Sequence, residues 1–186
     1  GIQEETEPTK PLQFGVTILS TSRVLMSSYT RFIGGYRNES KASYYGDTDS
    51  IIIHADAYAD AKARDTENKI FGDNFGQLSE EGKGGKILRA IFLAPQTYIL
   101  EVVRSDGVCI WHMAAKGIPQ KFRDIPVEEY YSKYDKNVDD GQMDLKTINY
   151  YLLNEMDEIV SSRSMLNWDY FYKMTQGHSV LCTFGS

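Results

Sequence analysis

Two aspartates one residue apart, Asp47 and Asp49, stand between a pair of tyrosines and three consecutive isoleucines in the segment SYYGDTDSIIIHA. Two carboxylates this close repel each other and resist burial unless a cation neutralises them. Mg²⁺ is such a cation, because it prefers hard oxygen ligands and commonly takes one or two carboxylates from a protein, leaving positions for water and phosphate oxygens. Aspartates are also ordinary turn residues. The pair alone therefore leaves a metal site and a solvated turn both open.

The residues on either side predict a β-hairpin with the aspartates at its tip. Residues 42–45 and 50–54 are rich in aromatic and β-branched side chains, and the turn-forming residues 46–49 separate them. If the tip stays extended, Asp47 and Asp49 point to the same side, because side chains alternate along a strand. That geometry would suit a metal ion that also binds a phosphorylated ligand.

Hydrophobic periodicity predicts helices and strands around this hairpin. Apolar residues recur at helical spacings over residues 12–33, which indicates a core helix packed against a sheet. Gly34 and Gly35 end it. The other expected segments are, in order, a helix at 55–68, a loop at 71–85, strands at 86–93, 97–103 and 108–114, helices at 126–134, 145–159 and 168–174, and a strand at 180–184.

Composition places the chain among ordinary folded proteins. It has 186 residues, of which 41% are hydrophobic and 25% charged, with no long apolar run and no basic, apolar signal peptide. We therefore expect no membrane partner and an intracellular location. The net charge of −6 argues against coating nucleic acid through bulk charge, although Lys83, Lys86 and Arg89 form a local basic patch. Cys109 and Cys182 lack the spacing of a zinc or redox pair.

Spacing excludes several other ligand-binding motifs. An EF-hand needs a glycine where Ile52 stands. A P-loop needs four residues between its glycines, whereas five separate Gly76 from Gly82. The histidines suit no metal triad and are interpreted as packing or surface residues. They are His54, His112 and His178.

The full string YGDTDS, residues 45–50, resembles the YxDTDS motif of family B DNA polymerases. Further along, residues 93–98 (LAPQTY) and 116–118 (KGI) resemble the KxY region and the downstream lysine of the same family, particularly its protein-primed branch in adenovirus-like viruses and linear plasmids. The sequence GGK at residues 84–86 fits the same pattern. The resemblance extends from about residue 12 to residue 122.

The resemblance implies a two-metal nucleotidyl transfer, in which Mg²⁺ or Mn²⁺ ions stabilise the attacking 3′-oxygen and the leaving pyrophosphate. Asp49 would be the direct metal ligand, and Asp47 would support the site. Gly46, Thr48 and Ser50 would shape the turn that presents them.

The same resemblance implies contacts with the primer. Tyr45 and Tyr98 would lie against the primer terminus, and Lys116 would contact a backbone phosphate unless it is only a solvated lysine at a strand end. Gln96 stands where the family usually has lysine, so it can donate a hydrogen bond but carries no charge. We therefore expect Gln96 to bind the primer more weakly than a lysine would, or to share this contact with Lys86 and Lys116.

Two family motifs, DxxSLYPS with the other metal-binding aspartate and KxxxNSxYG with the nucleotide-binding lysine, occur nowhere in the 186 residues. The chain therefore resembles the C-terminal part of a polymerase palm, residues 11–121, and the start of the thumb, residues 122–186, after a tail at residues 1–10. The expected fold is α+β: a palm-type antiparallel sheet with packed helices, followed by a mostly helical thumb portion. We expect this chain alone not to extend a primer.

The implied partners are primer–template DNA, a deoxynucleoside triphosphate and, in the protein-primed branch, a terminal protein. The implied source is a virus or a mobile linear replicon. Two alternatives stay open. One is a polymerase of the same family that starts from a nucleic-acid primer, which the upstream sequence would distinguish. The other is a catalytically inert polymerase-like binding or scaffold domain, whose acidic surface recruits a basic partner.

Overall fold

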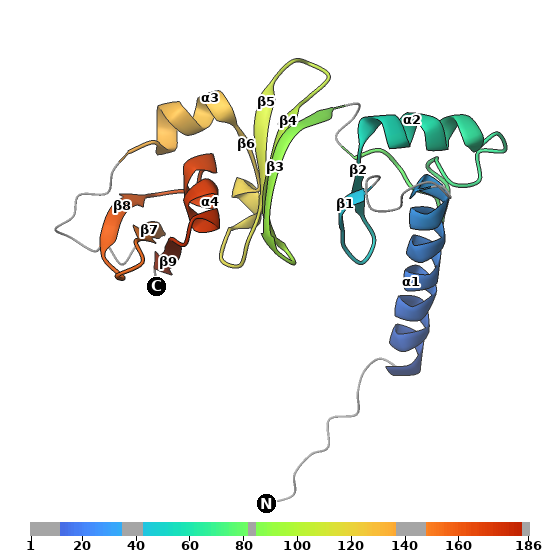
Figure 1. Ribbon diagram of the computed structural model, residues 1–186, viewed down its shortest axis with the longest axis horizontal. Helices are drawn as coiled ribbons and strands as arrows, with labels where there is room; N and C mark the ends of the chain where they lie inside the picture. Colours follow the sequence, from blue (N-terminus) through green and yellow to red (C-terminus); the bar gives the residue numbers. More distant parts are fainter. Residues whose placement is uncertain (1–11, 35–42, 82–84, 137–147, 184–186) are drawn as a thin grey trace, which may run out of the picture. The chain divides into compact units, whose positions relative to one another are not determined.

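The computed structural model describes residues 12–34, 43–81, 85–136 and 148–183 (Figure 1). The expected tail at residues 1–10 lies outside this part of the chain. The chain divides into two compact units, Gly1–Ser79 (unit 1) and Glu80–Ser186 (unit 2). Antiparallel sheets and helices occur together, which confirms the α+β class.

Unit 1 contains the predicted hairpin between two helices. Strands β1 (Ser43–Gly46) and β2 (Ile51–Ile53) pair antiparallel, as expected, and α2 (Ala55–Arg64) follows directly. Helix α2 begins here because His54 caps its N-terminus: the His54 Nδ1 accepts the backbone N–H of Asp56 at 3.1 Å. His54 therefore joins the end of β2 directly to the start of α2.

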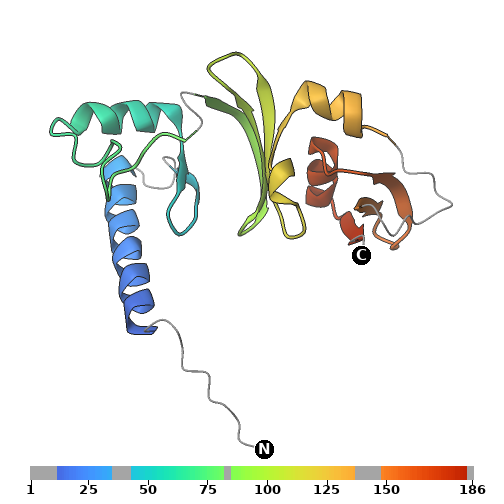
Figure 2. The same cartoon turned by 180° about the vertical axis from the view of Figure 1, so that it is seen from behind.

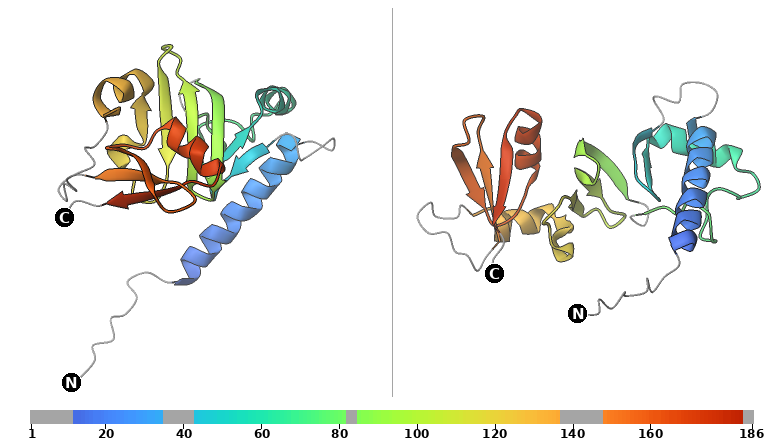
Figure 3. Two further views of the ribbon diagram at one scale, coloured as in Figure 1. Left: turned by 60° about the vertical axis from the view of Figure 1, so that its left-hand side comes forward. Right: turned by 90° about the horizontal axis from the view of Figure 1, so that it is seen from below.

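The helix α1 (Leu12–Gly34) has the predicted extent. It is a single unbroken helix (Figure 3) that packs against α2. Ile33 in its last turn is buried beside Ala61, with Ile53 of β2 packed against them. Leu19 and Val24 are exposed. On the predicted apolar face, Leu25 is exposed, whereas Tyr29 and Phe32 nearer the C-terminal end of the helix are half-buried.

The loop after α2 is held by a buried carboxylate. Asp65 is 8% exposed, and its two oxygens accept the backbone N–H groups of Lys69, Ile70 and Phe71 at 2.9, 3.0 and 3.0 Å. Beyond it, Phe71 forms an isolated bridge with Leu78, so the predicted loop at 71–85 contains one point of strand-like pairing. The predicted helix at 55–68 ends at Arg64 because the chain turns around Asp65.

Unit 2 begins with a four-stranded antiparallel sheet that contains the three strands predicted over residues 86–114. Its strands follow one another in sequence and in space, and Figure 2 shows them from behind. They are β3 (Lys86–Ala94), β4 (Thr97–Val103), β5 (Cys109–Ala114) and β6 (Asp124–Pro126).

The remainder of unit 2 alternates helical turns with a second antiparallel sheet in the order β8-β7-β9. The helical segments expected at 126–134 and 168–174 and the strand expected at 180–184 are confirmed. The elements are η2 (Gln120–Phe122), α3 (Val127–Glu129), the π-helical η3 (Tyr130–Tyr134), β7 (Asn149–Leu153), β8 (Ile159–Arg163), α4 (Trp168–Thr175) and β9 (Ser179–Thr183).

The helix expected at 145–159 is wrong over its described part, because β7 and the start of β8 occupy it. A turn separates the two strands. The Asn154 Oδ1 accepts the backbone N–H groups of Met156 and Glu158, and Asp157 adopts a φ of 61°. Turn chemistry therefore outweighed the helical spacing of the apolar residues. Because this helix is absent from the described residues, the expectation of a mostly helical segment after residue 121 is also wrong.

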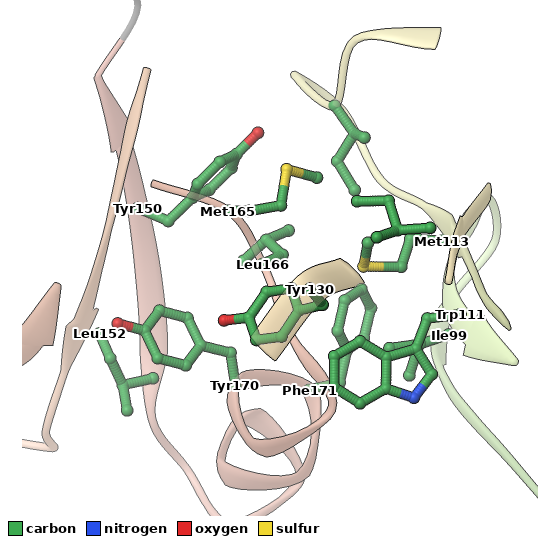
Figure 4. Close-up of a cluster of buried hydrophobic side chains, with 12 residues drawn as sticks. Ile99, Trp111, Met113, Tyr130, Tyr150, Leu152, Met165, Leu166, Tyr170 and Phe171 are labelled. Carbon is green, nitrogen blue, oxygen red and sulfur yellow. The ribbon is translucent and has the colours of Figure 1, made fainter. Parts of the chain in front are cut away.

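One hydrophobic core holds unit 2 together (Figure 4). Helix α4 packs against β3 and β4 of the first sheet and against β9 of the second. Phe171 of α4 and Trp111 of β5 are both almost fully buried in this core, and Tyr130 of η3 lies with its ring centroid 4.9 Å from that of Trp111. Residues from before and after position 121 therefore share a single core.

The boundary between the two compact units lies within the segment that the sequence assigned to the palm. The sequence placed a palm–thumb boundary between residues 121 and 122, whereas the compact units divide between Ser79 and Glu80. Strand β6 pairs with β5 across the expected boundary, with Ile125 opposite Trp111. The turn at residues 115–118 lies within unit 2, before the expected boundary. The assignment to palm and thumb stays a prediction.

Candidate metal and nucleic-acid site

The hairpin of unit 1 presents the two aspartates at an exposed turn. The backbone N–H of Asp47 donates to the Ser50 carbonyl at 2.9 Å, so Thr48 and Asp49 form the tip. The condition under which the aspartates would point to the same side, an extended tip, is not met. The turn sets the relative directions of the two side chains, because side chains alternate regularly only along an extended strand.

The two carboxylates have different surroundings. The Asp47 Oδ1 accepts the backbone N–H of Thr48 at 2.7 Å and the Thr48 hydroxyl at 3.2 Å. Within the described part of the chain, no side chain forms a hydrogen bond or an ion pair with the Asp49 carboxylate. Asp47 is thus held in place by its neighbour, and Asp49 presents its oxygens to solvent. Neither is paired with a described lysine or arginine.

This donor set fits a Mg²⁺ or Mn²⁺ ion bound together with a phosphorylated ligand. Two exposed carboxylates supply hard oxygen ligands, and the remaining positions belong to water and phosphate. No cluster of three or more His, Cys, Asp or Glu residues suited to a metal ion occurs among the described residues. The tip therefore offers two carboxylates, fewer protein ligands than a closed structural metal site has.

The other residues of the motif lie along the hairpin. Tyr45 is half-buried on β1 opposite Ile52, and Gly46 pairs with Ile51. A Cβ added at Gly46 would meet only the Ser50 carbonyl oxygen within 4 Å, at 3.8 Å. Neither space nor a positive φ requires glycine there. The structure gives Gly46 no special part in shaping the turn.

The second set of predicted residues belongs to unit 2, at the β3–β4 turn. Ala94 pairs with Thr97, so Pro95 and Gln96 form a two-residue turn. Proline fixes φ near −65° at the first position, and Gln96 adopts a φ of 59° at the second, which is the pattern of a type II turn. Gln96 is exposed at this tip.

Tyr98 and Lys116 lie at the same end of the sheet as Gln96. Tyr98 follows the turn by one residue and pairs with Ala114, the last residue of β5. Lys116 stands two residues beyond it, exposed on a turn in which the Ile118 N–H donates to the Ala115 carbonyl at 3.3 Å. The register therefore puts Gln96, Tyr98 and Lys116 at one end of the sheet.

Lys86 lies at the opposite end of the same hairpin. It begins β3 and pairs with Val103, whereas Gln96 follows the last residue of that strand. At roughly 3.3 Å per residue the strand separates the two ends by roughly 25 Å. Lys86 and Gln96 therefore cannot bind the same phosphate. Of the two lysines expected to share primer binding with Gln96, only Lys116 lies at the same end of the sheet.

Arg89 of the predicted basic patch is engaged within unit 2. Its guanidinium donates to both carboxylate oxygens of Glu101, at 3.0 and 2.8 Å, and stacks 4.0 Å from the ring centroid of Trp168. The hydrogen bond from Arg89, the largest influence, and one from Trp111 lower the pKa of Glu101, while partial burial acts in the opposite sense. Arg89 therefore joins the sheet to α4, and it is not presented as a phosphate ligand. Lys83 lies outside the described residues.

Three further residues lie beside this end of the sheet, and for Phe92 and His112 the sequence predicted no ligand contact. Phe92 pairs with Tyr98, His112 lies on the neighbouring strand with its ring centroid 6.0 Å from that of Tyr98, and the carbonyl of Arg123 accepts the Met113 N–H at 2.8 Å. Phe92 and His112 were visible in the sequence as strand residues. Their alignment with Tyr98 depends on strand register, which the sequence pattern did not supply.

Comparisons with protein-family models, with curated proteins and with solved structures found no match. Across residues 12–34, 43–81, 85–136 and 148–183, no helix combines the length and the apolar character required to cross a membrane.

Proposed function

We propose that the chain is part of a template-directed DNA polymerase of the family B type, from its protein-primed branch. In this proposal the whole enzyme adds deoxynucleotides to a primer 3′-hydroxyl, or to a hydroxyl of a terminal protein, by two-metal-ion nucleotidyl transfer. The source would be a virus or a mobile linear replicon. Residues 11–121 would belong to the palm and residues 122–186 to the start of the thumb.

The observation that carries the proposal is the string YGDTDS at the tip of an antiparallel hairpin, with both carboxylates exposed. The aspartates alone would also suit a solvated turn, so the resemblance of the full string carries the proposal. The Thr48 contacts to Asp47 hold one carboxylate in place without neutralising it. Two exposed carboxylates one residue apart leave oxygen ligands accessible to a divalent cation.

The roles of the residues follow from their places. Asp49 would be the direct ligand of the ion, because its carboxylate has no other described partner, and Asp47 would support it. Bound Mg²⁺ would stabilise the charge that develops on the phosphates during transfer. Gln96, Tyr98 and Lys116 would hold the primer end, with Lys116 supplying the positive charge that Gln96 lacks.

The test is the location of a paramagnetic ion on the 186-residue chain. Mn²⁺ added to the isotopically labelled chain should broaden the backbone amide signals of residues 46–51 first, since Mn²⁺ prefers the same oxygen ligands as Mg²⁺. The variant Asp49→Asn should remove most of this local broadening, because an amide is a poor ligand for a hard cation.

The variant Asp73→Asn is the matched control. Asp73 is exposed in the same unit, so its substitution removes the same charge from another loop and should leave the broadening at the tip unchanged. Broadening that spares residues 46–51 in the wild-type chain, or that persists there in Asp49→Asn, would show that the tip is a solvated turn.

A further inference from the structure

The turn that carries Lys116 is fixed at both of its ends. The Ile118 N–H donates to the Ala115 carbonyl at 3.3 Å, and Gly117 adopts a φ of 87°, which is the pattern of a type II turn. Glycine takes up this conformation without steric cost at the second corner of the turn. Ile118 is buried in the core of unit 2, whereas Lys116 at the first corner is exposed.

A tyrosine of the second sheet contacts the same turn. The Tyr150 hydroxyl on β7 donates to the Gly117 carbonyl at 3.3 Å. Tyr150 is almost fully buried in the core of unit 2 (Figure 4), and burial is the largest influence that raises the pKa of its hydroxyl. A buried neutral hydroxyl needs a hydrogen-bond partner. The Gly117 carbonyl supplies one, so the contact satisfies Tyr150 and holds the turn at the same time.

This contact crosses position 121, where the sequence placed the boundary between palm and thumb. Gly117 precedes that position and Tyr150 follows it, yet both belong to unit 2. A lysine loses conformational entropy when a ligand orders its side chain, and a mobile backbone would add to that loss. A backbone that is already held removes the second contribution. The Tyr150 hydroxyl is therefore placed to affect Lys116 without touching a ligand.

We propose that Tyr150 is a positioning residue for Lys116. Its hydrogen bond to the Gly117 carbonyl holds the turn, so that the lysine projects from a fixed place at the end of the four-stranded sheet. The effect on the turn depends only on contacts within unit 2. Its consequence for the primer rests on the proposed function, in which Lys116 contacts a primer phosphate. In this way a residue of the expected thumb segment takes part in primer binding through the turn alone.

The first test measures the mobility of the turn by NMR relaxation of the backbone amides in the 186-residue chain. In the wild type, residues 116–118 should be as rigid as β5, with order parameters of about 0.85. In Tyr150→Phe, which keeps the ring in the core, they should fall toward about 0.6 while β5 stays rigid. Tyr170→Phe is the matched control, because Tyr170 is equally buried but its hydroxyl accepts that of Ser161 at 2.9 Å. It should leave the turn rigid.

The second test is a double-mutant cycle on the affinity for a labelled primer–template duplex, measured by fluorescence anisotropy at low salt. Lys116→Ala should weaken binding about fivefold, and Tyr150→Phe about threefold, because the first removes the charge and the second only its fixed placement. In the Lys116→Ala background, Tyr150→Phe should have no further effect. A merely structural role of Tyr150 would weaken binding equally in both backgrounds.

Three results would overturn the proposal: a flexible turn in the wild-type chain, a rigid turn in folded Tyr150→Phe, or an equal loss of affinity in the two backgrounds. The first of these needs no variant, so the proposal is tested even if Tyr150→Phe does not fold. Unchanged affinity in Lys116→Ala would instead refute the primer contact of the proposed function. The relaxation measurement alone would then decide whether Tyr150 holds the turn.

Discussion

At the scale of single residues, two aspartates of the chain have opposite surroundings. Asp65 is buried and accepts three backbone N–H groups, whereas Asp49 is exposed and has no partner among the described residues. A buried carboxylate that is fully hydrogen-bonded stabilises a fold, and an exposed partner-free one is free to bind a ligand. Both stand beside apolar strands or turns, so their sequence neighbours do not distinguish them.

Asp65 should make the stability of unit 1 depend on pH. The hydrogen bond from Phe71 is the largest influence that lowers the pKa of the Asp65 carboxyl, followed by those from Ile70 and Lys69, while burial raises it. A lowered pKa means that the unfolded state binds the proton more readily. The stabilisation is therefore present above the unfolded pKa of about 4 and is lost as the pH falls through the folded pKa.

The substitution Asp65→Asn should destabilise unit 1 at neutral pH, because its NH₂ group would face backbone N–H donors. Urea unfolding followed by the NMR signals of α2 at several pH values measures the effect. The variant should be less stable than the wild type at pH 7 and should show less further loss in acid. Asp73→Asn serves as the charge-matched control. Equal midpoints for Asp65→Asn and the wild type at neutral pH would refute this account of the loop.

At the scale of elements, residues 148–159 show two local signals in competition. Leu152, Met156 and Ile159 have helical spacing, but Asn154 and Asp157 form the turn of a β-hairpin. The side chain of Asn154 satisfies two backbone donors, and a helix would give up these bonds. In α4 the two signals agree, because Asn167 precedes the first residue of the helix and caps its N-terminus.

The Asn167 cap should contribute measurably to unit 2. Its Oδ1 accepts the Tyr170 N–H at 2.8 Å, and its Nδ2 donates to the Tyr130 hydroxyl at 2.9 Å. Burial is the main reason that the pKa of Tyr130 rises to about 12, so this hydroxyl stays neutral and needs a partner. Asn167→Ala should cost about 2–4 kcal/mol, from a lost cap and an unpaired buried hydroxyl.

Tryptophan fluorescence measures this effect, because both tryptophans, Trp111 and Trp168, belong to unit 2. The midpoint of urea unfolding should fall in Asn167→Ala. Asn167→Asp is the control, since its carboxylate can still accept the Tyr170 N–H and the Tyr130 hydroxyl proton, and it should lose less. A midpoint for Asn167→Ala within error of the wild type would rule out the cap.

At the scale of the whole molecule, two cores lie in two units, and the predicted site residues are shared between them. The hairpin tip belongs to unit 1, and Gln96, Tyr98 and Lys116 belong to unit 2. Two-metal transfer needs a set of carboxylates that holds both ions in line with the nucleotide. The sequence supplies one such motif, on the hairpin tip.

The purified 186-residue chain is therefore expected not to extend a primer. The measurement is incorporation of labelled deoxynucleotide on a primer–template with Mg²⁺ or Mn²⁺, with a known DNA polymerase as the positive control. Metal-dependent incorporation that disappears in Asp49→Ala would show that this chain contains a complete catalytic site, contrary to our expectation. Incorporation that survives in Asp49→Ala would instead remove Asp49 from the chemistry.

The sequence by itself determined the acidic hairpin, the strands at residues 86–114 and the helix at 168–174, because local periodicity, turn residues and caps decide such elements. Only the tertiary structure decided that residues 149–159 form β7, a turn and the start of β8, and that one core spans position 121. It also aligned Phe92, Tyr98 and His112 and put Lys86 at the far end from Gln96. These features depend on strand register and on burial by distant residues, which short-range patterns do not encode.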